Sequence, residues 1–167
     1  MSKLFSRRKL IGAGGVAALT PIVAMANRAQ AAPLPATVVA LADPVRVFDS
    51  RTAPPSLGGG KLVTGTSLGV SVGGITPSDV VAAAVFVNVT VTDTEGRGYL
   101  VVRASDLKGD RPLPPTSNVN WSADGQTVAN LVITAVGGEN TLEVHAGGSG
   151  RTHFIVDVQA YVPALVI

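Results

Sequence analysis

The chain has 167 residues, of which 46% are hydrophobic and 14% charged, and its lack of cysteine excludes disulfides, thiolate zinc sites and cysteine nucleophiles. Its formal net charge is +2, but five of the thirteen basic residues precede residue 32, and the remainder carries eight basic against eleven acidic residues. This net charge of −3 excludes the cationic face that nucleic-acid binding requires, and no block of like charges indicates a membrane-surface patch.

Residues 1–31 resemble a twin-arginine export signal. Arg7 and Arg8 precede a mildly apolar run, and Ala29-Gln30-Ala31 places small residues where a signal peptidase cleaves. The run contains three glycines and a proline, so it is too short and too weak to form a membrane-spanning helix. We therefore expect cleavage after Ala31 and a secreted mature chain without a membrane span.

Strand-like stretches separated by turns follow the signal. After a lead segment at 32–43, with ATVVAL as a candidate first strand, the strongest pattern lies at 82–93, where valines alternate with small and polar residues. Prolines and glycines make 52–62 irregular. Turns at 92–98 and 123–125 are expected to close β-hairpins. The other predicted strands are residues 45–51, 66–72, 99–105, 117–121, 127–136, 141–146 and 152–162.

About eight strands at regular spacing, with no competing helical pattern, predict an all-β fold. We expect a single-domain antiparallel β-sandwich over residues 44–163, with Greek-key or jelly-roll connections, followed by an apolar tail at 164–167. The roughly 135 residues after the signal suffice for one core without disulfides.

Polar residues inside the predicted strands favour a structural network. In VRVFDSR (45–51), Asp49 shares a face with Val45 and Val47, and a partly buried carboxylate there needs pairing with Arg51 or Arg46. Asparagine is disfavoured in strands, so we expect several asparagines to satisfy backbone groups at strand ends. The predicted network consists of Asp49, Arg51, Asn88, Asn118, Asn120, Asn130, His153 and Asp157.

Five phrases stand out along the chain: PVRVFDSR (44–51), VFVNVTVTDTEGRGYLVV (85–102), PTSNVNW (115–121), QTVANLVITAVG (126–137) and THFIVDVQAYVP (152–163). Together and in this order they resemble a β-rich accessory module of secreted proteins from high-GC Gram-positive (actinobacterial) bacteria. The resemblance covers nearly the whole mature chain. It implies a module that stands beside hydrolases or alone, with no settled activity. Ala160 stands where the family pattern has glycine.

The sequence offers no catalytic constellation. His145 and His153 are the histidines available as a base, and no serine lies in a G-x-S-x-G elbow. His153 and Asp157 fall on one strand about 13 Å apart, too far for a direct hydrogen bond. The residues of this strand expected to face the core are Phe154, Val156, Val158 and Ala160.

No cofactor and no metal site is predicted. Asp93 with Glu95, and Asp106 with Asp110, flank turns, but neither pair fits an EF-hand or a zinc spacing. Trp121 and Tyr161 are the candidate aromatic platforms for a ligand, and the alternative is that both rings pack in the core.

These features favour a secreted, non-enzymatic binding or accessory module that contacts the cell envelope, an extracellular polymer or a protein partner. The alternative is a self-associating structural subunit in which ATVVAL (36–41) or ALVI (164–167) adds to another sheet edge. A third hypothesis is a small secreted hydrolase that uses scattered carboxylates, whose spacing the sequence does not reveal.

Overall fold

Two antiparallel sheets make up the computed structural model. It describes residues 37–106, 109 and 111–164. The expected export signal with Arg7 and Arg8, the cleavage site after Ala31 and residues 165–167 of the apolar tail lie outside the described residues.

The described residues contain nine strands, so the all-β prediction is confirmed. The strands are β1 (Val39–Asp49), β2 (Leu62–Val63), β3 (Ser67–Ser71), β4 (Ala82–Glu95), β5 (Gly98–Ala104), β6 (Val119–Trp121), β7 (Val128–Ala135), β8 (Thr141–Gly148) and β9 (Arg151–Pro163). Two short 3-10 turns accompany them, η2 (Pro55–Leu57) and η3 (Gly138–Asn140). The extra strand is β2, in the segment predicted to be irregular, and the domain start predicted at residue 44 falls inside β1.

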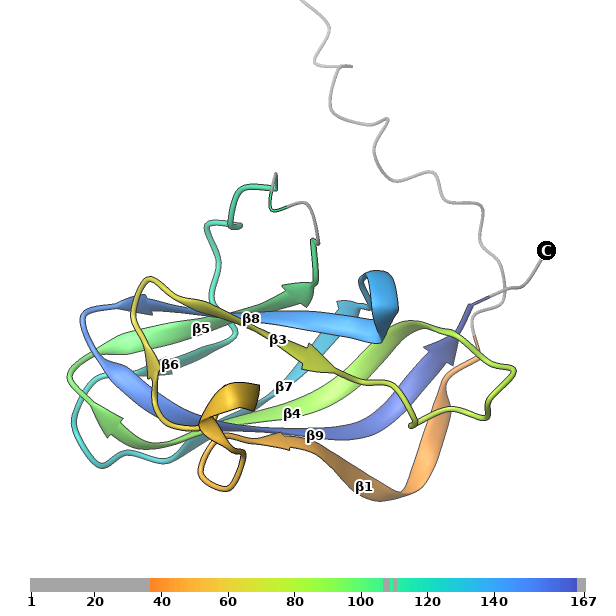
Figure 1. Ribbon diagram of the computed structural model, residues 1–167, viewed down its shortest axis with the longest axis horizontal. Coiled ribbons are helices and arrows are strands. Elements are labelled where there is room, and N and C mark those ends of the chain that lie inside the picture. Colours follow the sequence, from red (N-terminus) through yellow and green to blue (C-terminus); the bar gives the residue numbers. More distant parts are fainter. Residues whose placement is uncertain (1–36, 107–108, 110, 165–167) are drawn as a thin grey trace, which may run out of the picture. The chain divides into compact units, whose positions relative to one another are not determined.

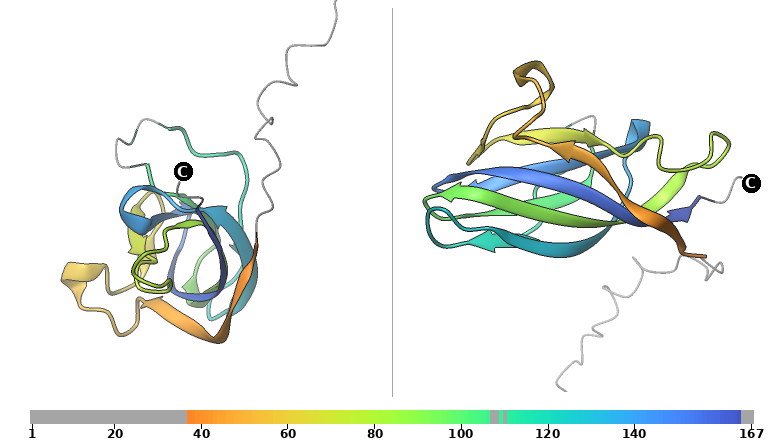
Figure 2. Two further views of the ribbon diagram at one scale, coloured as in Figure 1. Left: turned by 90° about the vertical axis from the view of Figure 1, so that its right-hand side faces the viewer. Right: turned by 90° about the horizontal axis from the view of Figure 1, so that it is seen from below.

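The strands are divided between two sheets. Sheet A has the order β1-β9-β4-β7, with β2 paired to the start of β9, and sheet B has the order β3-β8-β5-β6. Figure 1 shows the two layers, and the right panel of Figure 2 shows the four long strands of sheet A side by side. Apart from β1–β2 and β5–β6, each strand is followed by a strand of the other sheet. This connectivity is that of a jelly roll, and the predicted antiparallel sandwich is confirmed.

Both predicted hairpins are wrong, because the turns carry the chain from one sheet to the other. The turn after β4 leads to β5 in sheet B, and the turn after β6 leads to β7 in sheet A. Each of these strands has one apolar face, and folding the second strand over the end of the sandwich brings the two faces together. The crossings β2–β3, β4–β5, β6–β7 and β8–β9 lie at one end, where backbone hydrogen bonds connect them.

Alternating valines build the core between the sheets. The fully buried valines of β4 are Val85, Val87, Val89 and Val91. Their period of two is the one that predicts a strand with one buried face. From β9, Phe154 enters the same core, and its ring stacks on Phe48 of β1 with centroids 4.8 Å apart.

A bulge in β1 changes which of its residues share a face. Between Arg46 and Phe48 the register advances by two residues in β1 and by one in β9, so Val47 is the extra residue. Phe48 therefore packs toward the core, while Arg46 and Asp49 lie close enough to hydrogen-bond. The predicted grouping of Asp49 with Val45 and Val47 is wrong for this reason.

A second irregularity lies near the end of β9. Up to Val158 the alternation follows the prediction, but the register then shifts, and Ala160 pairs with Phe86 between the core valines of β4. Ala160 is buried outside the core cluster, whereas Tyr161 belongs to it. The core position expected for Ala160 is thus taken by its neighbour, because one extra residue exchanges the two faces of a strand.

Candidate functional site

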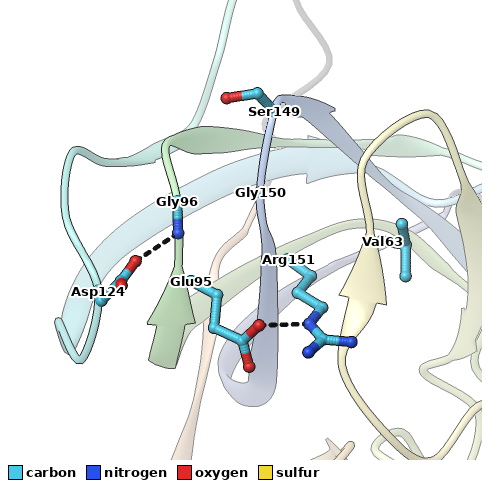
Figure 3. Close-up of a pocket in the computed structure, with 7 residues that line it drawn as sticks. All are labelled: Val63, Glu95, Gly96, Asp124, Ser149, Gly150 and Arg151. Carbon is cyan, nitrogen blue, oxygen red and sulfur yellow. Dashed lines mark hydrogen bonds and ion pairs between the residues drawn. The ribbon is translucent and has the colours of Figure 1, made fainter.

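A groove at the crossing end of the sandwich is the candidate site. It has a volume of about 620 Å³ and opens to solvent. Three of the four crossings and the end of β2 contribute to its walls, which Figure 3 shows in close-up. We call it the end groove, lined by Val63, Glu95, Gly96, Asp124, Ser149, Gly150 and Arg151.

An ion pair between neighbouring strands forms one wall of the end groove. Glu95 ends β4 and Arg151 begins β9, and their side chains face each other (Figure 3), with the Arg151 Nε donating to Glu95 Oε2. The hydrogen bond from Arg151, and to a smaller extent the one from Lys61, lowers the pKa of Glu95. The bond to Glu95 raises the pKa of Arg151. The two terminal nitrogens of Arg151 have no hydrogen-bond partner among the described residues, so they are available to a ligand.

Lys61 extends this ion pair into a cluster of four charges. Its Nζ lies 2.7 Å from Glu95 Oε1 and 2.8 Å from Asp93 Oδ2. Asp93 has a positive φ of 50°, and the β4–β9 register shifts between Thr92 and Glu95. Such irregularities change the direction of a side chain at a strand end, and here Asp93 meets Lys61. Two acids and two bases make this cluster neutral.

Close backbone contacts hold the walls of the groove in place. The carboxylate of Asp124 accepts the Gly96 N–H at 2.6 Å, and the Gly125 N–H donates to the Thr94 carbonyl at 2.7 Å. A Cβ on Gly150 would collide with the carbonyl oxygen of Glu95, so only glycine fits where these crossings pack together. The groove is therefore largely preformed.

Sequence reasoning did not find this site. From sequence, Asp93 and Glu95 are candidates only for a metal pair or for the scattered carboxylates of a hydrolase, whereas both are bound to Lys61 from the segment expected to be irregular. Arg151 joins them from 56 residues further along the chain. The available signal was the charge of Lys61 and Arg151 beside glycine-rich turns, which carries no information about their spatial neighbours.

Asp49 lies in a second polar cluster, on β1. Its side chain is 8% exposed, and its carboxylate accepts hydrogen bonds from the Arg51 backbone N–H, from Arg51 Nε and Nη2, and from Arg46 Nη1. The side-chain bond from Arg51 is the main cause that lowers the pKa of Asp49 to about 2. Arg46 also holds Asp157 of β9 through two hydrogen bonds of 2.8 and 3.2 Å. The cluster ties β1 to β9.

His153 and Asp157 have different partners, Ser50 directly after β1 and Arg46 within β1. His153 Nδ1 lies 3.0 Å from Ser50 Oγ, whereas Asp157 binds Arg46. Ser50 is 1% exposed, and its Oγ also accepts the backbone N–H of Phe154 at 2.9 Å. A serine in this position fixes the end of β1 against β9, and its oxygen is inaccessible to a substrate.

A second serine–histidine contact lies on sheet B. Ser67 Oγ lies 2.9 Å from His145 Nδ1 and donates to Glu143 Oε1 at 3.0 Å. Glu143 in turn accepts a bond of 2.8 Å from Arg103, which also donates to the carbonyl of Pro112. This chain of contacts connects β3, β8 and β5 to the loop before β6, and within it the Ser67 hydroxyl donates to the Glu143 carboxylate.

The four asparagines of the predicted network differ in the groups that they bind. Asn118 Oδ1 accepts the Val102 N–H at 2.7 Å, and Asn130 Nδ2 donates to the Asn118 carbonyl at 2.7 Å, so both satisfy backbone groups. Asn120 instead accepts a bond from the Ser117 hydroxyl, and Asn88 donates to the Thr90 hydroxyl. The eight residues of the predicted network therefore belong to separate local clusters.

Neither nominated aromatic offers a platform to a ligand. Trp121 is 4% exposed and Tyr161 6%, and both belong to the core cluster. Both occupy inward positions of their strands, and Trp121 covers Gly98, where a Cβ would meet its ring. Tyr99, which packs over Gly147, is 37% exposed. The nomination of Trp121 and Tyr161 is thus corrected in favour of the core alternative.

Within the part of the chain that the structure describes, no three metal-ligating side chains gather, and no helix has the length and apolarity needed to cross a membrane. The chain matches no protein-family model, and no curated protein matches its sequence.

Proposed function

We propose that this protein is a secreted, non-enzymatic binding module, of the kind that accompanies secreted actinobacterial proteins, and that the end groove holds its ligand. The observation that carries the proposal is the pair of unpartnered terminal nitrogens of Arg151, held over a preformed groove by Glu95. Side chains already fixed by ion pairs lose little rotamer freedom on binding, which favours affinity. The export signal and the family resemblance support an extracellular partner.

The balance of charges favours an uncharged, hydroxyl-rich ligand. Lys61 and Arg151 offset Asp93 and Glu95, so the cluster does not select a strongly charged molecule. Guanidinium and carboxylate groups both bind sugar hydroxyls through charge-assisted hydrogen bonds. An open groove at the end of the sandwich admits a segment of a polymer. We therefore propose a glycan of the cell envelope as the ligand class.

A binding role also agrees with the state of the serine and histidine groups. Ser50 is buried and its oxygen accepts a backbone N–H, and Ser67 donates to Glu143. The Ser50 oxygen lies 3.0 Å from His153 Nδ1 but is buried away from a substrate, and the Ser67 hydroxyl, although 2.9 Å from His145 Nδ1, donates to Glu143. This supports the proposal of a non-catalytic module over the hydrolase hypothesis.

Replacing Arg151 by alanine is expected to weaken binding to the polymer about tenfold or more, because two charge-assisted donors are lost. The measurement is co-sedimentation of the purified protein with insoluble actinobacterial cell wall, over a range of polymer concentrations. The matched control is Arg97→Ala, which removes the same charge from an exposed neighbouring turn outside the groove.

The expected result is loss of co-sedimentation for Arg151→Ala and parent-like binding for Arg97→Ala. Parent protein that remains in solution with cell wall would contradict the ligand class. Equal losses in both variants would show that binding depends on charge alone and would contradict the assignment of the groove.

A further inference from the structure

Sheet A has one edge that lacks the usual protection against pairing with another strand. Its β1 edge is interrupted by two register shifts and carries Pro44 and Arg46. At its other edge, β7 pairs with β4 through eight consecutive residues without a shift. The edge strands of sheet B are shorter, with five residues in β3 and three in β6. Long, regular edges are the ones that proteins ordinarily block with charge, proline or bulges.

The residue composition of β7 also leaves this edge unprotected. The strand reads VANLVITA, with no charged residue, proline or glycine. Leu131 is 50% exposed and Ile133 62% exposed, and both lie on the outer side of sheet A, opposite Asn88 and Phe86 of β4. Large apolar side chains on an unprotected edge indicate a surface that is covered by a partner.

We infer that β7 pairs antiparallel with β7 of a second copy of this chain, which joins two sheets A into one continuous sheet. If the two-fold axis passes through Val132, the order of apolar and polar residues in β7 matches that of the second copy. In that register Leu131 of each copy lies beside Ile133 of the other copy, and Ala129 of each copy lies beside Ala135 of the other. On the inner side, Asn130 lies beside Thr134. Apolar residues thus meet apolar ones and polar residues meet polar ones, as a two-fold interface requires.

The surroundings of the strand locate the centre of this interface. Thr134 and Ala135 border a small hollow with Pro112 and Pro114 of the loop before β6, whereas Leu131 and Ile133 are not part of it. The central pairs of the interface are therefore those at residues 131–133. Pairing through one strand of eight residues buries less than a standard interface of about 1,600 Å², so we expect a reversible dimer.

The first test measures the mass of the full chain by sedimentation velocity over micromolar to near-millimolar concentrations. The parent is expected to change from monomer to dimer as the concentration rises. Ile133→Lys is expected to stay monomeric throughout, because the new charge would lie against Leu131 of the other copy. Ile133 is mostly exposed, so this change leaves the core intact. The control, Val45→Lys on the opposite edge, is expected to dimerise like the parent.

A cross-linking experiment tests the register, using the absence of cysteine from the chain. An oxidised mixture of Leu131→Cys and Ile133→Cys proteins is expected to form covalent dimers that contain one copy of each, because these positions face each other directly. Each variant alone is expected to cross-link far less, since its cysteines lie diagonally across the pair. A parent that stays monomeric, a dimer that survives Ile133→Lys, or equal cross-linking of the single variants would overturn the inference.

Discussion

Replacing Phe154 by alanine is expected to lower the free energy of unfolding by about 4 kcal/mol. Phe154 is fully buried in the core, and its ring stacks on Phe48 of the neighbouring strand. The substitution removes this contact and leaves a cavity between the two sheets, which the β-branched residues around it cannot fill without leaving their rotamers.

Chemical denaturation, followed by the fluorescence of the buried Trp121, measures this loss. Leu57→Ala is the matched control, because it also shortens a large apolar side chain, but one that is 67% exposed. We expect the control to change stability by less than about 0.5 kcal/mol. A loss of about 1 kcal/mol or less in Phe154→Ala would contradict a core in which this ring connects β1 to β9.

Asp49→Asn is expected to cost about 2 kcal/mol at neutral pH. The depression of the Asp49 pKa from 3.8 to about 2 means that the folded state holds the carboxylate in its charged form. The variant keeps the size of the side chain but loses the negative charge that Arg51 and Arg46 share. With one partner removed, the remaining guanidinium groups keep part of their hydration, since both are about half exposed.

The same residue predicts a pH dependence. Because the folded pKa is lower than the unfolded one, the contribution of Asp49 is fully present above about pH 5 and decreases as the pH falls from about 4 to about 2. The difference in stability between the parent and Asp49→Asn should therefore become small near pH 2. The control is Asp79→Asn at an exposed position. If the difference between the parent and Asp49→Asn were the same at pH 7 and at pH 2, the ionic explanation would be wrong.

Strand positions followed from the sequence where alternation was long and regular. The β-branched run of β4 is an example, because a period of two with one apolar face has few other structural solutions. The pairing of strands did not follow. Turn spacing indicates where the chain reverses, but a reversal between Glu95 and Gly98 fits a hairpin and a crossing between sheets equally well. The crossing is favoured only once the apolar faces of all strands are considered together.

Single extra residues explain the errors within strands. The assignment of faces in β1 failed at Val47 and that in β9 failed before Ala160, since one inserted residue exchanges all later faces. The end groove was invisible for a related reason. Lys61, Glu95 and Arg151 come from three strands or turns that are distant in the chain, and their proximity depends on the jelly-roll order.

The place of β9 in sheet A has a consequence for how the chain acquires its structure. This strand, late in the sequence, lies between β1 and β4, and the contact of Arg46 with Asp157 spans 111 residues. During synthesis, sheet A therefore cannot be completed until the ribosome has released residue 163. Until then β1 has no neighbour and β4 has a free side, so the chain must form its most distant pairing before the core is complete. Folding dominated by such long loop closures is slow, in the range of milliseconds to seconds, and a chaperone that shields β4 during this interval would raise the yield of native protein.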